Sequence, residues 1–429
     1  MRRLLVPFVL LAAIGLVAAS CGGDDSSSTT TTAATGAATG AVTIGALLDL
    51  SGDGASLGQG SKAALEAAVT QAKAQGVDVT LDVRDTGGDP ATALKEIQSL
   101  REAGITTVIG PQTSSEAKEV LSFADEQGML VVSQSSTAST LAIPGDALFR
   151  MIPTDQVEGV ASGDLIMVNP GPRKVVIAHR DDSGNTGLAN AVSATVSARG
   201  GTVVPGTIVY PAEGADYAAV AQQIADAVAG ADGEEEVVVY LAGFGEVADI
   251  LAAASTLTGL ADTAFYGGDG SAQSEALITD TTAAAFAAGP ARGYPSPLPT
   301  IAGDAAAPSE ALTAALPEPE PLAYGAYDAL LIIVAALQQA GFESSGDQLR
   351  DAFAGAANGF AGVSGPVELD AAGDRATMPF AFWGVCDVDG TFEWRDLGDW
   401  VPPQNAGEAG VIAYMGCMTG GVGSGAPTP

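Results

Sequence analysis

Apolar, β-rich segments alternate with amphipathic, helix-like segments through most of this 429-residue chain, and this alternation constrains its fold more than any single motif does. The first series has strands at 42–50, 79–84, 106–110 and 129–133 and helices at 61–75, 90–103 and 115–127. Its strands are nearly uninterrupted apolar runs, as is typical of parallel strands covered on both faces. The βαβ order predicts an open, doubly wound α/β sheet.

A second series of the same kind follows a helix expected from about Asp155. It has strands at 174–179, 202–210, 235–242 and 263–267 and helices at 187–198, 217–229 and 245–257. Beyond it come a helix at 322–340, suited to a core and too short for a membrane span, and a helix at 347–354. Alternating strands are expected in 365–394, with a hairpin turn at Asp389-Gly390. Two α/β sheets of similar size predict a bilobal protein.

The first twenty residues have the features of a secretory signal peptide. Arg2 and Arg3 precede an apolar run at 4–19, which ends in Ala18-Ala19-Ser20-Cys21. This ending resembles a bacterial lipobox, in which the cysteine is acylated and becomes the new N-terminus; an ordinary secretory signal is the alternative. Residues 21–40 are predicted to form a flexible tether, because 22–40 contain only Gly, Asp, Ser, Thr and Ala. A disordered tail is expected at 418–429.

Charge and residue usage argue against several classes of function. The 51 acidic residues outnumber the 17 basic ones, for a net charge of −34, which argues against nucleic acid or an anionic lipid surface as partner. One histidine, His179, and three cysteines leave no zinc cluster and no catalytic triad, so neither an enzyme nor a cofactor is expected. A dinucleotide-binding glycine fingerprint fails because Leu57 stands at its third glycine. Cys386 and Cys417 predict a disulfide in an exported protein, with two free thiols as the alternative.

Several short motifs, in a fixed order, resemble the branched-chain amino-acid-binding proteins, which are periplasmic-binding-protein type 1 receptors of ABC importers. The resemblance covers essentially 42–396. In the first half it rests on the segments 108–115, 131–137 and 149–150. In the second half it rests on Asp181-Asp182-Ser183-Gly184, Gly267-Gly268-Asp269-Gly270, Tyr324-x-x-Tyr327-Asp328-Ala329, Gly365-Pro366 and Asp370-x-x-Gly373-Asp374.

The resemblance implies an architecture of two doubly wound, Rossmann-like lobes joined by three hinge crossings. The amino-terminal lobe would comprise 41–152 plus about 289–365, and the carboxy-terminal lobe 153–288 plus about 366–417. The crossings are expected near 150–153, 288–290 and 365–366. A monomer that closes its lobes over the ligand is expected.

The resemblance also implies a site for a zwitterion, whose two charges both need partners when buried. Ser114 aligns with the family's carboxylate-binding serine and begins a predicted helix, where the dipole favours an anion; a purely structural N-cap is the alternative. Ser135 and Thr137 align with a loop that contacts both ends of the ligand. Asp269 aligns with the acid that pairs the α-ammonium, and a solvated turn aspartate is the alternative.

Other positions depart from the family. Ser183 or, with a shifted gap, Gly184 stands where the family has a tyrosine over the ligand, and Phe244 is expected to supply a second aromatic. Thr113 and Leu57 are expected to line the side-chain pocket, and neither is aromatic. The sequence therefore supports the narrow class of branched aliphatic amino acids less strongly than the broader class of amino acids and related small amides.

The resemblance implies an extracytoplasmic lipoprotein, anchored to the bacterial cell membrane through Cys21, that delivers an amino acid to ABC permease subunits. The alternative is a ligand-sensing receptor of the same fold that binds an amide, urea or another small polar solute and signals to a membrane partner.

Overall fold

The computed structural model describes residues 38–417, apart from positions 53, 169–172, 232, 234, 302, 319 and 404–406. These residues belong to one compact unit, Ala37–Pro429. The predicted signal peptide, the lipidation residue Cys21, most of the tether and the tail lie outside the described residues.

Five parallel strands form the sheet of the amino-terminal lobe, in the order β2-β1-β3-β4-β5. They are β1 (Gly40–Leu48), β2 (Val77–Asp85), β3 (Thr107–Ile109), β4 (Leu130–Ser133) and β5 (Leu148–Arg150). Strand β1 lies between β2 and β3, so the chain winds outward in both directions from β1. This is the doubly wound topology that the sequence predicted, and it places the switch point at the carboxyl ends of β1 and β3.

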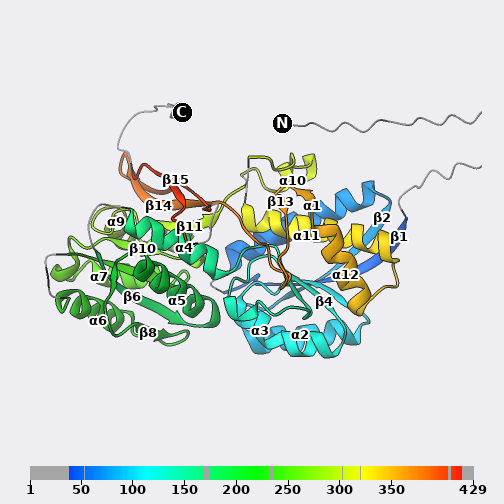
Figure 1. Cartoon of the computed structure of the whole chain (residues 1–429), viewed down its shortest axis with the longest axis horizontal. Helices are drawn as coiled ribbons and strands as arrows, with labels where there is room; N and C mark the ends of the chain where they lie inside the picture. The colour runs from blue at the N-terminus through cyan, green and yellow to red at the C-terminus, as the bar shows by residue number, and fades with distance from the viewer. Residues whose placement is uncertain are drawn as a thin grey trace, which may run out of the picture. The chain divides into compact units, whose positions relative to one another are not determined.

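Helices cover both faces of this sheet (Figure 1). Neighbouring strand residues point to opposite faces, so Val108 packs in one core and Ile109 in the other. Helices α2 (Pro90–Glu102) and α3 (Ser114–Glu126) share the core of Val108. The other core holds α1 (Ala55–Ala74), α10 (Glu310–Ala315), α11 (Pro321–Ala340) and α12 (Gly346–Ala357). A short 3-10 turn, η1 (Ser139–Leu141), precedes β5.

Helix α11 is the only helix in the described part of the chain that is long and apolar enough to cross a membrane. It is instead the central helix of a core, because 78% of its apolar window is buried and it packs between α1 and α12. The expectation of a core helix at 322–340 is confirmed.

The sheet of the carboxy-terminal lobe repeats the topology, with the parallel order β10-β9-β6-β7 and β8 also paired with β6. Its strands are β6 (Arg173–Asp181), β7 (Thr202–Val203), β8 (Ile208–Pro211), β9 (Glu236–Ala242) and β10 (Phe265–Gly267). One strand was predicted for 202–210, but the chain breaks there because Gly206 adopts a positive φ of 93°. The two-lobe α/β fold is as predicted.

Helices again cover both faces of this second sheet. One face carries α4 (Asp155–Met167) and α5 (Ser183–Ala198). The other carries α6 (Tyr217–Ala229), α7 (Val247–Ala254), α8 (Glu275–Thr279) and α9 (Thr281–Ala288). Two 3-10 turns complete the lobe, η2 (Thr258–Leu260) and η3 (Asp269–Ser271).

An antiparallel sheet, β11-β14-β15-β16, joins the carboxy-terminal lobe. It comprises β11 (Ser296–Pro299), β14 (Phe380–Val388), β15 (Thr391–Val401) and β16 (Val411–Tyr414). The predicted hairpin turn is confirmed, since Asp389 and Gly390 link β14 to β15 with φ angles of 54° and 86°. Cys386 and Cys417 form the predicted disulfide, with their Cα atoms 5.6 Å apart.

The lobe cores show where the chain passes from one lobe to the other. Ala291 and Tyr294, beyond the expected boundary at about 289, pack in the carboxy-terminal core. Val367, beyond the expected boundary at about 365, packs in the amino-terminal core, next to the small sheet of β12 (Phe360–Gly362) and β13 (Gly365–Val367). Both crossings therefore lie later than expected, because side-chain packing and not the nearest proline decides where a lobe ends.

Helix α1 begins six residues earlier than predicted, at Ala55 instead of Ser61. The glycines of this segment suggested a loop, but they lie in the helix because it approaches other backbone closely. A Cβ at Gly58 would lie 1.9 Å from the carbonyl oxygen of Asp49, and one at Gly60 would lie 2.0 Å from a carboxylate oxygen of Glu320. A larger residue at Gly58 would collide with the Asp49 backbone, whereas one at Gly60 would have to displace the Glu320 side chain.

Candidate functional site

The predicted binding residues all follow the carboxyl ends of parallel strands. In the amino-terminal lobe, Ser114 follows β3 and Thr137 follows β4. In the carboxy-terminal lobe, Ser183 follows β6, Phe244 follows β9 and Asp269 follows β10. Loops at this edge, beside the switch point of each sheet, are where doubly wound folds bind ligands.

Ser114, the first residue of α3, accepts two hydrogen bonds from the loop after β4. The amides of Thr137 and Ala138 donate to its Oγ over 3.1 and 3.0 Å. A serine hydroxyl has one proton and two acceptor positions, so this arrangement leaves its proton for an acceptor on a ligand. Its place at the N-terminus of a 13-residue helix favours an anionic acceptor such as a carboxylate.

The N-cap of α3 is Thr113, so the alternative that Ser114 serves only as the cap is wrong. The Thr113 hydroxyl accepts from the Glu116 amide over 3.3 Å and Glu116 Oε2 accepts from the Thr113 amide over 2.9 Å, which makes a capping box. The hydroxyl also donates to Glu116 Oε2 over 2.7 Å. These bonds commit the Thr113 hydroxyl to the helix end. Leu57, the other residue expected to line the side-chain pocket, lies half-buried in the first turn of α1.

Hydrogen bonds made by the side chains of Ser135 and Arg150 hold the loop that carries Thr137. Ser135 donates its hydroxyl to the Gln112 carbonyl over 2.8 Å, which leaves its backbone as the part that could face a ligand. Arg150 donates to the carbonyls of Ser136 and Ala138, over 3.3 and 2.8 Å.

Arg150 is itself fixed by a buried bidentate pair with Asp374, at 2.5 and 2.7 Å. Arg150 is fully buried and Asp374 is 1% exposed. The pair joins positions 224 residues apart in the chain. Both belong to motifs that carried the family resemblance, and the structure gives these motifs a shared role in positioning the loop after β4.

Asp269 lies beside two more carboxylates, Asp155 and Glu158 from the first turn of α4, and we call these three the carboxylate trio. Glu158 Oε1 accepts the Asp269 amide over 3.0 Å, and Asp269 accepts the Gly270 amide over 2.7 Å. Asp155 connects the trio to the other lobe, because its amide donates to the Thr137 carbonyl over 2.7 Å. The trio therefore adjoins the loop whose backbone amides donate hydrogen bonds to Ser114.

Burial controls the protonation of the trio. Burial raises the pKa of Asp155 to about 7, and the charge of Asp269 adds to the effect. Burial also raises the pKa of Asp269 to about 6, and that of Glu158 well above its usual range. Glu158 further feels the charges of the other two members. Carboxylates held this way lower their free energy when a cation or a proton joins them.

The two lobes touch beside this site. Ser183, the first residue of α5, donates its amide to Ser115 Oγ over 3.2 Å. A Cβ at Gly184 would lie 3.5 Å from Ser114 Oγ, so the start of α5 covers the start of α3. Phe244 packs against the loop of Asp269, since a Cβ at Gly270 would lie 2.9 Å from its ring, and Arg180 stacks on the ring at 5.1 Å.

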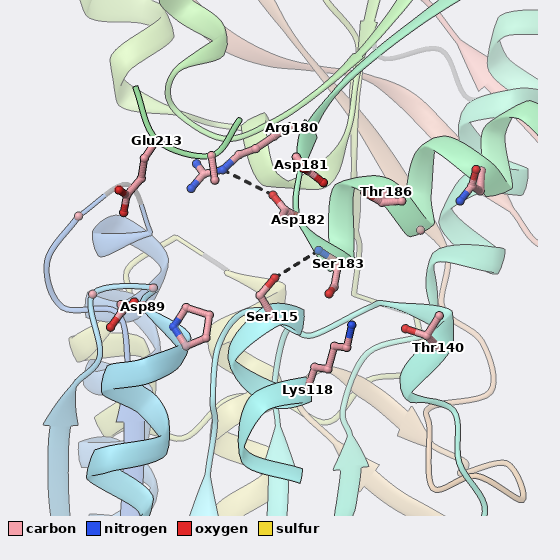
Figure 2. A pocket seen from close by; sticks show the side chains of 17 residues that line it. Asp89, Ser115, Lys118, Thr140, Arg180, Asp181, Asp182, Ser183, Thr186 and Glu213 are labelled. Carbon is pink, nitrogen blue, oxygen red and sulfur yellow. Dashed lines mark hydrogen bonds and ion pairs between the residues drawn. The ribbon is translucent and has the colours of Figure 1, made fainter. Parts of the chain in front are cut away.

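A pocket of about 700 Å³ opens between the lobes around the Ser115–Ser183 contact (Figure 2). We call it the mouth pocket. Its lining includes Ser115 and Lys118 from one lobe and Arg180, Ser183 and Gly187 from the other. The trio, Ser114 and Thr137 are not among its lining residues, and Ser183 is the one predicted binding residue that lines it.

Sequence reasoning missed Asp155, Glu158 and the role of Arg150. Asp155 and Glu158 are spaced i, i+3 on an expected helix, and that spacing could have indicated one acidic face. No local pattern could have paired Arg150 with a residue 224 positions away. Within the described ranges, no group of three or more His, Cys, Asp or Glu residues is arranged to hold a metal ion.

Comparisons with known proteins agree with this fold. The family model described as periplasmic binding protein matches residues 41–387. An uncharacterised protein of Methanocaldococcus jannaschii is 29% identical over 57% of this chain and 61% of its own length, so the match spans less than two thirds of that relative. The Leu/Ile/Val-binding protein BraC3 of Rhizobium johnstonii is 28% identical over 70% of this chain and 80% of its own length.

Solved structures with similar folds bind different solutes. The substrate-binding protein LivJ of Streptococcus pneumoniae, solved with isoleucine, superposes with a TM-score of 0.66 at 20% identity, over 82% of this chain and 98% of LivJ. A solute-binding protein of R. palustris, solved with 4-hydroxybenzoate, gives a TM-score of 0.66 at 19% identity, over 84% and 96% of the two chains. The two-lobe architecture and the family match over most of the chain lead to one conclusion: this chain belongs to the periplasmic binding protein family.

Proposed function

We propose that this protein is an extracytoplasmic solute-binding protein of an ABC importer, and that it captures an amino acid between its lobes. One observation carries the proposal: a serine with a proton to donate at a helix N-terminus adjoins, through Thr137 and Asp155, a group of carboxylates in the other lobe. An anion receptor and a cation receptor in one cleft match the two charges of an α-amino acid.

In this proposal the ligand's carboxylate accepts from Ser114 Oγ and the first turn of α3. The ligand's ammonium lies against Asp269 and Asp155. Because the two ends are held by different lobes, the ligand stabilises the closed arrangement by contacts that an open one lacks. The Ser115–Ser183 contact would close over the bound ligand, and the closed form would be delivered to the permease.

The binding test is calorimetry of the purified protein against the twenty amino acids, urea, short amides and 4-hydroxybenzoate. We expect at least one amino acid to bind, while 4-hydroxybenzoate binds weakly because it has no cation for Asp269. Asp269→Asn and Ser114→Ala should each weaken binding at least tenfold, which is about 1.4 kcal/mol. The matched controls are Asp262→Asn, an exposed acid of the same lobe, and Ser122→Ala on the exposed face of α3.

Two results would count against the proposal. If no amino acid binds, the ligand class is wrong. If an amino acid binds but both site variants behave like their controls, the cleft has been assigned to the wrong residues.

We propose further that Cys21 carries the lipid that holds the protein at the membrane. In the native host, Cys21→Ser should release the protein from the membrane fraction into the soluble fraction. A Cys21→Ser protein that stays membrane-bound would exclude this anchor.

A further inference from the structure

We propose that the ligand of this cleft is a basic amino acid, one whose side chain carries a second positive charge. The inference rests on the proposed function and specifies the side chain that the cleft selects. Two independent features point to it: an excess of buried carboxyl groups at the ammonium end, and a polar, acidic mouth pocket where the ligand's side chain would extend.

The carboxylate trio offers more carboxyl groups than one ammonium can engage. Asp155 is fully buried and Glu158 is 1% exposed. Only one oxygen of Glu158 has a hydrogen-bond partner among the described residues, and at Asp155 the Thr137 hydroxyl and the Ser139 amide only partly offset the effect of burial on the pKa. The nearby cation, Arg150, is already engaged by Asp374 and two backbone carbonyls.

A fourth buried group beside the trio also lacks a partner. The Tyr240 side chain is fully buried, and its hydroxyl makes no hydrogen bond within the described part of the chain. Burial raises the pKa of Tyr240, and nearby Glu158, Asp269 and Asp155 add to the effect, which places the hydroxyl close to the trio. A Cβ at Gly268, next to Asp269, would lie 3.2 Å from this hydroxyl. Three buried carboxyl groups and a hydroxyl without a partner, with no free cation among these described residues, favour a ligand of net positive charge, because a nearby cation favours the ionised form of each carboxyl group.

The mouth pocket adjoins the trio. Gly187 lines the pocket, and a Cβ at this position would lie 2.1 Å from Asp155 Oδ2. The Asp155 carboxylate therefore packs directly against Gly187, so only the backbone of this glycine stands between Asp155 and the pocket. A ligand held at the trio would have the acidic pocket beside it.

The lining of the mouth pocket does not suit an aliphatic side chain. Among its described lining residues there is no aromatic residue, leucine, isoleucine, valine or methionine. A leucine or isoleucine ligand would leave its apolar surface against polar groups and gain little from burial. A basic side chain would place its methylenes over the glycines and its charge among hydrogen-bond acceptors.

The charges of the mouth pocket favour a cation as well. Asp89, Asp181, Asp182 and Glu213 line it, against Lys118 and Arg180. Arg180 is already paired with Asp182 and Glu246. Figure 2 shows Asp89 and Glu213 together on one side of the pocket, with Lys118 further away, near Thr140. Lys118 lies one helical turn beyond Ser114, on the side where the ligand's carboxylate would bind.

The test compares three ligands of nearly the same length on the full chain by calorimetry at pH 7.5. L-Lysine has both ammonium groups and the carboxylate, L-norleucine lacks the side-chain ammonium, and 1,5-diaminopentane lacks the carboxylate. We expect lysine to bind at least tenfold more tightly than either of the others. The preference over norleucine should shrink as salt is added, because the attraction at the pocket is partly screened.

Two variants test which residues produce the preference for lysine over norleucine. Asp181→Asn with Glu213→Gln should weaken lysine at least fivefold and leave norleucine unchanged, whereas the control Asp262→Asn with Glu275→Gln removes two exposed charges outside the pocket and should change neither. Glu158→Gln keeps the acceptor for the Asp269 amide and removes one carboxyl group that a cationic ligand could ionise. It should weaken lysine and reduce its advantage over norleucine.

The outcomes separate this inference from the proposed function. Norleucine or leucine binding as tightly as lysine would overturn the inference and leave amino-acid capture intact. Diaminopentane binding more tightly than lysine, or no binding by any amino acid, would overturn both. A lysine preference that survives the Asp181/Glu213 variant undiminished would also overturn the inference, since the pocket would then not be its source.

Discussion

Replacing Asp374 with asparagine should destabilise the protein more than any surface change, because it leaves a guanidinium buried without a counter-charge. Arg150 is fully buried and makes two of its hydrogen bonds to the Asp374 carboxylate. An asparagine retains one acceptor, but its NH₂ group would face a guanidinium nitrogen that now lies 2.7 Å from Asp374 Oδ2. Two donors would then meet in a dry site.

The expected loss is about 3–5 kcal/mol, the usual result of removing one member of a buried ion pair. The pair itself contributes little net stability, because burial raises the pKa of Asp374 in spite of Arg150, so desolvation outweighs their attraction. The loss comes from the charge left behind. As a control, Glu66→Gln breaks an exposed pair with Lys62, whose side chains are 59% and 37% exposed, and should cost no more than about 0.5 kcal/mol.

Urea denaturation followed by tryptophan fluorescence measures both losses. A double variant, Arg150→Met with Asp374→Leu, removes the stranded charge and should recover most of the stability. It should still bind ligand poorly, because the carbonyls of Ser136 and Ala138 lose the donor that positions their loop. A loss below about 1 kcal/mol for Asp374→Asn would refute the reasoning, since it would mean that Arg150 is compensated in another way.

Three further predictions concern the disulfide, the trio and α1. Cys386→Ser with Cys417→Ser opens a link between residues 31 apart and should cost about 3–4 kcal/mol in the same denaturation assay, and a wild type insensitive to reductant would contradict this. Asp155 and Asp269, with pKa values of about 7 and 6, keep protons that the unfolded chain releases near pH 4. The ligand-free protein should therefore lose stability as the pH rises from about 4 to about 7, and Asp155→Asn should flatten that profile; an unchanged slope would refute the assignment. Gly58→Ala should cost about 1–3 kcal/mol because its Cβ would meet the Asp49 carbonyl, and a neutral result would mean that α1 shifts freely.

The order of strands and helices could be predicted from the sequence because each element has its own local residue pattern. Parallel strands are apolar on both faces, and helix ends show their caps, so β1, α2 and the Asp389-Gly390 turn lie where the sequence predicted them. Glycines misled the prediction of α1, because a glycine needed for close packing looks the same in sequence as one needed for a loop.

The candidate site could be predicted from the sequence only in part, because strand ends are visible in the sequence and the packing of helices is not. Asp269 and Ser114 follow strand ends, and that position is visible in sequence. How many carboxylates gather around Asp269 depends on which face of α4 turns inward, and that is set by packing against the sheet.

Short-range periodicity, turn chemistry and cysteine count are local properties, so the order of the residues is enough to predict the two doubly wound lobes, the hairpin and the disulfide partners. Other features exist only in the folded chain: Arg150 meets Asp374, three carboxyl groups share one corner of the cleft, and Asp155 packs against Gly187 at the edge of an acidic pocket. Burial and charge proximity arise when segments far apart in the sequence come together, and the proposed preference for a basic ligand rests on them.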